Sequence, residues 1–291
     1  MTNRPVDLVR LMRPCQWLKS LVVCSGLLFA HAWHDAGRVW QVGLAVLAMS
    51  LASSAVYAFN DLTDVAADRL HPQKANRPLA SGAVSVPAAR KIGLASLTVA
   101  LGLAWLVSPG ALIGVLVYLG LNVGYTCGWK HVAILDVCLI ASGFLLRILI
   151  GTTAVGIPAS HWLLLCGFLI ALFLALTKRR AELVQVPAGR PVLSAYPLPL
   201  LDSLITITAA VSLLSYALYT LDPLTARLQG TPNLIATVPC VVYGLFRYLF
   251  LLHTAGAGQD FVADLLQDRQ LRLAIVVWLG CFVFLRLYAG P

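Results

Sequence analysis

Long apolar runs dominate this chain, and short polar or breaker segments divide them. A helix that crosses a bilayer needs roughly 20 mostly apolar residues. Several runs end in turn chemistry, with Ser-Pro-Gly at 108–110, Gly-Ile-Pro at 156–158 and Asp-Pro at 222–223. The nine predicted spans are 17–33, 39–59, 89–107, 109–128, 132–157, 160–177, 203–221, 233–251 and 271–289. The pattern predicts an all-α polytopic membrane protein, with residues 1–291 forming a single integral-membrane domain.

Composition supports a lipid environment. Charged residues make up 11% of the chain, against roughly 25% in an ordinary soluble domain, and the mean hydropathy is +0.84. Too few polar residues are present to cover the surface of a soluble fold. The same apolar composition excludes a disordered chain, and it excludes a nucleic-acid-binding domain despite the net charge of +9. The 7 cysteines are scattered singly and are expected to be free thiols. No cleavable signal is recognised in the first 20 residues.

The basic residues predict an orientation. If the N-terminus is cytoplasmic, 16 of the 21 Lys and Arg residues fall in inside segments, and only Arg38, Arg227 and Arg286 fall outside. The chain is therefore expected in the cell (inner) membrane with a cytoplasmic N-terminus. Most acids also gather in the three long inside connections, 60–88, 178–202 and 252–270. Both signs of charge on one face indicate a site for an anionic substrate with a metal ion.

The sharpest chemical feature follows the second span, where Asn60, Asp61, Asp64 and Asp68 are spaced three or four residues apart. On a continuous helix these side chains share one face. Crowded carboxylates repel one another unless a cation lies among them, and hard oxygen ligands select Mg²⁺ or Mn²⁺. The motif therefore predicts catalytic, metal-binding aspartates at 61, 64 and 68 that hold Mg²⁺ and a diphosphate. A solvated helix end with acids by chance is the alternative.

Basic residues flank this motif. Lys74 and Arg77 lie in the following Pro- and Gly-containing loop, where they are expected to reach phosphate oxygens. Lys19 opens the first span and is a further candidate phosphate contact, although interface anchoring is equally compatible with its position. Asn60 is expected to bind a sugar hydroxyl or a water on the metal.

Charged residues also occur within the fifth span and after the sixth. Asp136 and Arg147 are eleven residues apart and lie nearly on one helical face. An arginine at this depth is costly unless it faces a polar cavity or pairs within the bundle, and the cavity is the prediction here. Lys178, Arg179 and Glu182 follow the sixth span. The first two are expected to bind phosphate, and Glu182 the metal or a sugar hydroxyl.

The fourth span ends with Tyr125 and Lys130, both on the predicted inside face. Lys130 would add to a cationic ring around a polyphosphate. Tyr125 is a candidate substrate contact, and anchoring at the membrane interface is the competing interpretation.

Together these motifs resemble the UbiA superfamily of membrane prenyltransferases. The match is closer to its decaprenyl-phosphate phosphoribosyltransferase branch, through Arg13 to Ser20, Asn60 to Gly82, Asp136 to Arg147 and Arg179 to Leu183. Ser20 stands where asparagine is usual in that branch. The superfamily fold implies nine transmembrane helices around a cavity that, with the orientation above, opens to the cytoplasmic face.

Two departures from the family pattern bear on the reaction. Aromatic prenyltransferases carry a second aspartate-rich motif after the sixth helix, whereas this chain has only Glu182 and the distant Asp202 there. The stretch between the last two helices is also poorer in glycine than in the phosphoribosyl branch, so no role is assigned to individual residues of 252–270.

The resemblance implies Mg²⁺-dependent transfer of a 5-phosphoribosyl group from phosphoribosyl diphosphate to a polyprenyl phosphate, with release of pyrophosphate. The product would serve envelope arabinan or glycan synthesis. Two alternatives remain open: prenyl transfer from a diphosphate to an aromatic acceptor, and a lipid-carrier transporter. The sequence leaves the oligomeric state and the polyprenyl chain length open.

Overall fold

In the computed structural model, residues 3–29, 32–70, 74–185 and 191–288 are described, and within them the regular structure is entirely helical. Eight helices are long and apolar enough to cross a membrane by length and composition. They are Ala36–Thr63, Val86–Val107, Pro109–Cys127, Leu135–Val155, His161–Gln185, Leu198–Leu221, Asn233–Thr254 and Arg269–Leu287. Each overlaps one of the predicted spans from the second to the ninth. The all-α polytopic prediction is therefore confirmed for the described part of the chain.

The first predicted span, 17–33, differs from the expected α-helix. It is a 3-10 helix, η1 (Pro14–Cys24), followed by a short α-helix, α2 (Ser25–Phe29). A 3-10 helix rises about 2.0 Å per residue, more than the 1.5 Å of an α-helix, so this segment still covers about 30 Å. Apolar length alone does not reveal that difference in rise. The count of nine spans and the cytoplasmic opening of a cavity remain predictions.

The chain groups into two compact units, and the single domain expected from the sequence remains a prediction. Unit 1 comprises Met1–Cys127 and Leu146–Ala159, and unit 2 comprises Gly128–Leu145 and Ser160–Pro291. The helix α6 (Leu135–Val155) contributes its first half to unit 2 and its second half to unit 1. Each unit is described by itself below.

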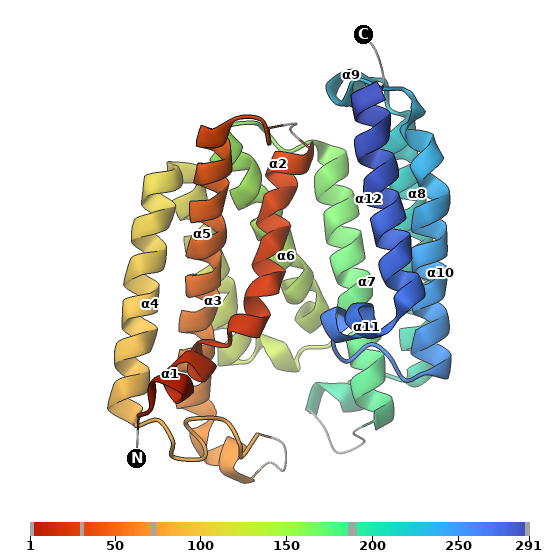
Figure 1. Cartoon of the computed structure of the whole chain (residues 1–291). Coiled ribbons are helices and arrows are strands. Elements are labelled where there is room, and N and C mark those ends of the chain that lie inside the picture. The colour runs from red at the N-terminus through yellow and green to blue at the C-terminus, as the bar shows by residue number, and fades with distance from the viewer. Residues whose placement is uncertain (1–2, 30–31, 71–73, 186–190, 289–291) are drawn as a thin grey trace. The chain divides into compact units, whose positions relative to one another are not determined.

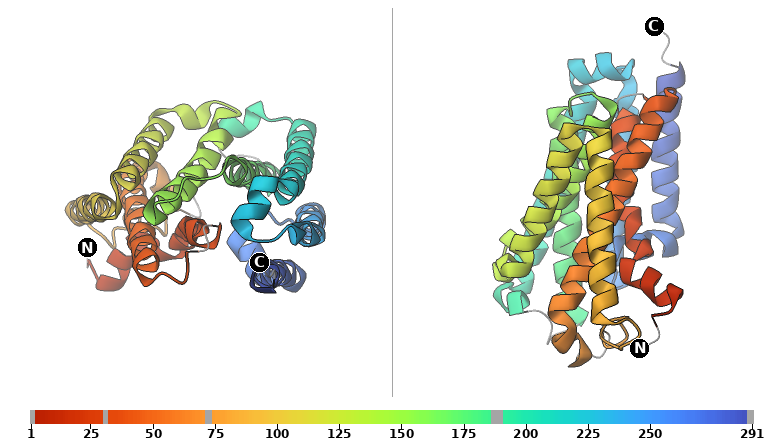
Figure 2. Two further views of the ribbon diagram at one scale, coloured as in Figure 1. Left: turned by 90° about the horizontal axis from the view of Figure 1, so that it is seen from above. Right: turned by 90° about the vertical axis from the view of Figure 1, so that its left-hand side faces the viewer.

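Unit 1 is organised around α3 (Ala36–Leu70), which packs along α4 (Val86–Val107) and also contacts α5 (Pro109–Cys127), as Figures 1 and 2 show. The buried face of α3 is rich in alanine and serine. Small side chains let helix backbones approach closely in a membrane, where no hydrophobic force drives helices together. The short α1 (Pro5–Met12) lies against the C-terminal end of α3 and brings residue 13 to it.

A close backbone contact fixes η1 and α2 in unit 1. A Cβ atom at Gly151 would lie 2.0 Å from the carbonyl oxygen of Val23, and one at Gly26 would lie 2.4 Å from the carbonyl oxygen of Gly151. Real Cβ atoms do not approach so closely, so only glycine fits at both positions. This contact seats the 3-10 segment directly on α6.

Unit 2 contains α7 (His161–Gln185), α8 (Leu198–Leu221), α10 (Val238–Thr254) and α12 (Arg269–Tyr288). Helices α7 and α8 pack together, as do α10 and α12 (Figure 1). Unit 2 also contains five shorter elements: η2 (Trp129–His131), η3 (Pro191–Ala195), α9 (Pro223–Gln229), η4 (Asn233–Thr237) and α11 (Phe261–Gln267). The break predicted at 222–223 lies between α8 and α9, where Asp222 caps α9 by accepting a hydrogen bond from the Thr225 N–H at 2.8 Å.

Candidate active site

The predicted acidic motif lies on one continuous helix. Helix α3 has 35 residues and extends beyond its membrane-compatible part, which ends at Thr63. Asp61 and Asp68 are buried, with 2% and 3% of their surface exposed, while Asp64 is half-buried. The expectation that these residues follow the spacing of a single helix is confirmed.

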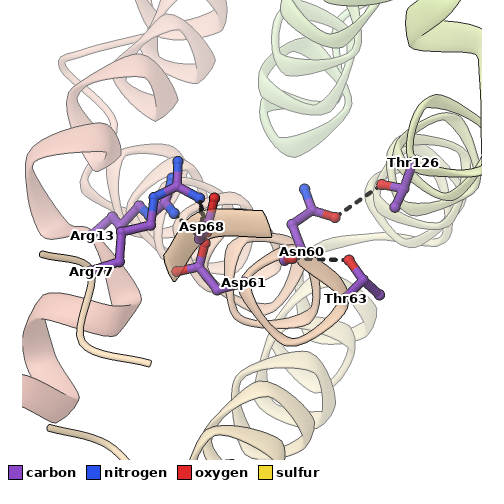
Figure 3. Close-up of polar contacts among 7 residues, drawn as sticks. All are labelled: Arg13, Asn60, Asp61, Thr63, Asp68, Arg77 and Thr126. Atoms are coloured by element: carbon purple, nitrogen blue, oxygen red, sulfur yellow. Dashed lines mark hydrogen bonds and ion pairs between the residues drawn. The ribbon is translucent and has the colours of Figure 1, made fainter. Parts of the chain in front are cut away.

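Two arginines from other segments bind the buried aspartates. Arg13 Nη2 donates to Asp61 Oδ1 at 2.5 Å, and Arg77 Nη1 donates to the same oxygen at 3.1 Å. Arg77 Nη1 also reaches Asp68 Oδ2 at 2.6 Å, so that it bridges the two carboxylates (Figure 3). The arginine side chains are 27% and 29% exposed, whereas the Asp61 side chain is 2% exposed. A buried acid is thus held by cations that water can still reach.

Backbone geometry directs Arg13 to this position. Arg13 joins α1 to η1 with φ +52° and ψ +61°, a left-handed conformation that is uncommon for a residue other than glycine. The Ser54 hydroxyl on α3 donates to the Met12 carbonyl at 2.8 Å, and Trp17 Nε1 donates to Ser54 Oγ at 3.0 Å. The Arg13 guanidinium lies 4.7 Å from the centre of the Tyr57 ring. Sequence reasoning placed Arg13 within a motif but gave it no role.

The carboxylate oxygens at the end of α3 meet some, but not all, of the requirements for binding a hard cation. Asp61 Oδ2 is buried and has no hydrogen-bond partner among the described residues, a state that costs about 1–3 kcal/mol unless something compensates it. A divalent cation is the partner that an unsatisfied carboxylate oxygen prefers. Within the described ranges, however, no three His, Cys, Asp or Glu side chains are gathered closely enough to hold a metal ion. Asp61 is therefore the best-supported ligand, and the full set of Asp61, Asp64 and Asp68 remains a prediction.

Asn60 is held by a residue that the sequence did not reveal. Thr126 Oγ1 on α5 lies 2.9 Å from Asn60 Oδ1 and donates a hydrogen bond to it (Figure 3). The same hydroxyl lies 2.9 Å from the carbonyl oxygen of Asn122. The side chain of Asn60 is thereby oriented beside Asp61 at the end of the membrane-compatible part of α3.

Arg147 lies in a polar cluster within unit 1. It is 6% exposed, and its Nη2 donates to Ser53 Oγ at 3.3 Å. Its guanidinium lies 5.0 Å from the centre of the Tyr118 ring, and the Tyr118 hydroxyl is 3.1 Å from Ser53 Oγ. These two contacts are with neutral groups, and the predicted role of Arg147 in lining a cavity remains a prediction.

Asp136 has different partners. In unit 2 its Oδ2 accepts from Arg179 Nε at 2.6 Å, and its Oδ1 accepts from the Tyr196 hydroxyl at 2.6 Å. Arg179 Nη1 also donates to Glu182 Oε2 at 2.6 Å. Arg179 is 1% exposed, so it lies inside a carboxylate network rather than on a surface open to phosphate.

The remaining predicted site residues are half-buried. Unit 1 contains Lys19 on η1, Lys74 in the turn after α3 and Tyr125 on α5. Unit 2 contains Lys130 on η2 and Lys178 on α7. Their predicted substrate contacts remain predictions. His71, which directly precedes Pro72 and therefore resembles a turn residue more than a metal ligand, lies outside the described residues.

The acids of 252–270 have structural roles. Asp260 caps α11 by accepting from the Val262 N–H at 3.0 Å, and Asp264 accepts from the Gly258 N–H at 2.8 Å. Asp268 accepts from the Leu271 N–H at 2.7 Å and pairs with Arg247 at 2.6 Å. The hydrogen bond from Arg247 holds the pKa of Asp268 below its usual range. These contacts account for acids that the orientation of the chain does not explain.

Comparisons with known proteins place these features in a family. The model of the UbiA prenyltransferase family matches residues 20–265. A Corynebacterium glutamicum protein named decaprenyl-phosphate phosphoribosyltransferase is 34% identical over 97% of this chain and 87% of its own length. A Mycobacterium tuberculosis protein of the same name is 32% identical, with 96% and 93% covered.

The fold has a solved counterpart as well. The structure of a UbiA homolog from Archaeoglobus fulgidus, described as bound to GPP and Mg²⁺, superposes with a TM-score of 0.72 over 97% of this chain and 99% of that one, at 17% identity. The matches to relatives and to the solved structure extend over nearly the whole chain, and so include both the long apolar helices and the acidic end of α3. The chain belongs to the UbiA prenyltransferase family, as an integral membrane protein.

Proposed function

We propose that this protein transfers a 5-phosphoribosyl group from phosphoribosyl diphosphate to a polyprenyl phosphate and releases pyrophosphate. The observation that carries the proposal is the similarity, over nearly the whole chain, to proteins named for this activity, at 34% and 32% identity. We further propose that the chain lies in the cell membrane with its N-terminus and active site on the cytoplasmic side. The positive charge of the inside segments supports this orientation.

The reaction needs little covalent chemistry from the protein. The bond between C1 of the ribose and the diphosphate oxygen breaks, and a phosphate oxygen of the acceptor bonds to C1. Because that oxygen is already an anion, no strong general base is required. Catalysis then depends on holding the two substrates in line and on stabilising the charge of the departing pyrophosphate.

Asp61 is proposed as the central residue of this stabilisation. In the part of the chain that the structure describes, its buried Oδ2 has no hydrogen-bond partner, while Arg13 and Arg77 bind its Oδ1. Asp64 and Asp68 would supply further oxygens for Mg²⁺, which when bound neutralises charge on the leaving pyrophosphate. Arg77 and Lys74, from the turn after α3, are proposed to bind phosphate oxygens.

Further residues are proposed to contact substrate. Asn60, fixed by Thr126, presents its amide to a ribose hydroxyl or a bound water. Lys19, Tyr125 and Arg147 are proposed contacts from unit 1, and Lys130, Lys178 and Glu182 from unit 2. Arg179 is proposed to act through Glu182 because it is buried and bound to carboxylates.

The charged residues of α7 favour a phosphoribosyl donor over a prenyl diphosphate. A second diphosphate–metal site would need uncommitted carboxylates after the sixth span. In the described part of that region Glu182 is bound by Arg179, and Asp202 is paired with Arg180 at 2.5 Å. Each of these two carboxylates thus has an arginine partner that partly neutralises it, which weakens the pair as a second site for a cation.

The test uses purified protein with labelled phosphoribosyl diphosphate, Mg²⁺ and a short polyprenyl phosphate. We expect label to move into the organic phase with release of one pyrophosphate per transfer. A parallel reaction contains a labelled prenyl diphosphate and an aromatic acid. Prenyl transfer in that reaction, without phosphoribosyl transfer in the first, would overturn the proposal. Uptake of unmodified substrate by reconstituted vesicles would instead indicate a transporter.

A further inference from the structure

Unit 2 contains a buried charged network in which the proposed mechanism gives a role to Glu182 and Arg179 but none to Asp136 and Tyr196. Asp136 and Arg179 are 0% and 1% exposed, and Tyr196 is 3% exposed. Four contacts of 2.6 Å join Asp136, Arg179, Glu182, Tyr196 and the Ile134 N–H. Burying charges is expensive even when they are paired, so such a network indicates a function or a requirement for one specific geometry.

Among the charged side chains of this network, Glu182 is the most exposed in the described structure. The Glu182 side chain is 15% exposed, whereas those of its partner Arg179 and of Asp136 are 1% and 0% exposed. Arg179 holds Glu182 Oε2, and Oε1 has no hydrogen-bond partner among the residues that the structure describes. Glu182 is therefore the member that can meet a ligand, through an oxygen whose position its partner fixes.

Charge counting separates Glu182 from its basic neighbours. The two carboxyl groups of Asp136 and Glu182 share the guanidinium of Arg179. Of the two, Glu182 is the one that water reaches, since its side chain is 15% exposed and that of Asp136 is 0% exposed. Lys178 and Arg180 flank Arg179 in the sequence, and Arg180 is neutralised by Asp202. A fixed carboxylate repels phosphate but accepts hydrogen bonds from hydroxyl groups.

Tyr196 links this carboxylate pair to the turn before α6. Its hydroxyl donates to Asp136 Oδ1 and accepts from the Ile134 N–H, each at 2.6 Å. Ile134 has φ +69°, which is strained for a β-branched residue and must be held by its surroundings. Burial and the hydrogen bond to Asp136 raise the pKa of Tyr196, so the hydroxyl stays protonated as the donor that this arrangement needs.

Backbone hydrogen bonds continue the linkage to Lys130. The Asp136 N–H donates to the Val132 carbonyl at 3.1 Å, and the Val132 N–H donates to the Trp129 carbonyl at 3.1 Å. Lys130 lies within η2, directly after Trp129. The same buried network thereby fixes both the Glu182 carboxylate and the turn that carries Lys130.

From this geometry we propose that Glu182 determines donor specificity by accepting the ribose hydroxyls of phosphoribosyl diphosphate, and that Arg179 and Tyr196 are positioning residues that hold it. The inference rests on the proposed function and extends it. A phosphoribosyl donor has vicinal hydroxyls, whereas a prenyl diphosphate has none. A carboxylate held in place by a buried arginine matches the first and offers nothing to the second.

The experiment compares the donor with pyrophosphate, the product that lacks hydroxyls. For each variant, the KM of phosphoribosyl diphosphate and the inhibition constant of pyrophosphate are measured. We expect E182A to raise the donor KM at least about tenfold, as the loss of a designed hydroxyl contact does. Its inhibition constant for pyrophosphate should stay within about twofold, because the change leaves phosphate contacts intact. Y196F should shift the donor KM in the same direction by a smaller factor.

The D202N variant is the matched control, because Asp202 pairs with the neighbouring Arg180 in the same unit. It should leave both constants unchanged. Equal weakening of donor and pyrophosphate in E182A, or no change in either, would overturn the inference while transfer by the wild-type protein upholds the proposed function. A wild-type protein that does not transfer phosphoribosyl groups would overturn both. If Y196F does not fold, E182A still decides, because Glu182 lies at the exposed edge of the network.

Discussion

Two clusters in this protein pair aspartate with arginine, and they differ in how completely they are enclosed. At the end of α3, Arg13 and Arg77 are 27% and 29% exposed and bind one oxygen of a buried aspartate. In unit 2, Arg179 is 1% exposed and bridges Asp136 and Glu182. Among the residues that the structure describes, the first cluster leaves a carboxylate oxygen without a hydrogen-bond partner, whereas the second satisfies both oxygens of its buried aspartate.

Enclosure decides what such a pair can do. An arginine in contact with water can exchange a carboxylate for a phosphate at little cost, because water solvates the group in transit. An arginine that is shielded from water must keep its carboxylate partners, since an unpaired buried charge costs several kcal/mol. The cluster on α3 is therefore suited to substrate binding and the cluster in unit 2 to fixing geometry.

The largest expected effect is on catalysis at α3. Replacing Asp61 with Asn should lower phosphoribosyl transfer by about 10³-fold, because the variant loses the carboxylate that would hold the Mg²⁺ needed to neutralise the departing pyrophosphate. The variant should elute as a monodisperse protein in detergent, like the wild type. The labelled-donor assay measures the loss, and transfer within tenfold of wild type would refute the central role of Asp61.

The second prediction contrasts the two arginine environments through stability. Arg179→Ala leaves two carboxylates unpaired in unit 2, a change that costs about 3–5 kcal/mol. The thermal midpoint in detergent should therefore fall by about 10 °C. Thermal unfolding followed by intrinsic fluorescence provides the measurement. A midpoint within about 2 °C of wild type would mean that the network does not stabilise the fold.

The third prediction is the counterpart at α3. Arg13→Ala removes a partly exposed partner, so the thermal midpoint should move by no more than about 3 °C. Transfer activity should nevertheless fall about 100-fold, because Asp61 loses its shortest contact. The distinction between the two clusters would be contradicted if Arg13→Ala and Arg179→Ala lowered both the transfer activity and the thermal midpoint in the same proportion.

These contrasts also show what sequence reasoning reaches. The helical spacing of Asp61, Asp64 and Asp68 is local, and α3 confirms it. Apolar length likewise predicts eight of the spans, although it overlooks the 3-10 conformation of Pro14–Cys24. Properties of a single segment are thus accessible from the pattern of residues along it.

Partners distant in the sequence are less accessible. Arg13 lies 48 residues from Asp61, Thr126 lies 66 from Asn60, and Tyr196 lies 60 from Asp136. Such pairings depend on helix packing, which no local periodicity encodes. For the same reason Arg179 resembled a phosphate contact in a basic stretch, although packing buries it against two carboxylates.

A smaller effect is expected from the residue that orients Asn60. Thr126→Val removes the hydroxyl but keeps the shape, and should lower transfer about tenfold because Asn60 is no longer held in place. Thr126→Ser keeps the hydroxyl and should retain activity within about threefold of wild type. Steady-state kinetics of the two variants side by side provide the measurement. Equal losses in both would show that the methyl group, and not the hydrogen bond, matters.

The smallest predicted effect concerns pH and the pair formed by Asp268 and Arg247. Because Arg247 lowers the pKa of folded Asp268, the pair stabilises the fold above the pKa of the unfolded chain, about 4. That stabilisation is lost as the pH falls through the folded pKa. At pH 7, Asp268→Asn should lower the thermal midpoint by at most about 2 °C. The difference from wild type should shrink as the pH approaches 3, and a difference that grew there would contradict the assigned direction.

The most direct test of the proposed active site is Mn²⁺ binding in the presence of pyrophosphate, followed by electron paramagnetic resonance on purified protein. The wild-type chain and the D202N control should bind Mn²⁺ with equal affinity. The D61N variant should bind it at least about tenfold more weakly, because it lacks the anionic oxygen that remains unsatisfied in the fold. Equal affinities for D61N and wild type would contradict the assignment of Asp61 as a metal ligand.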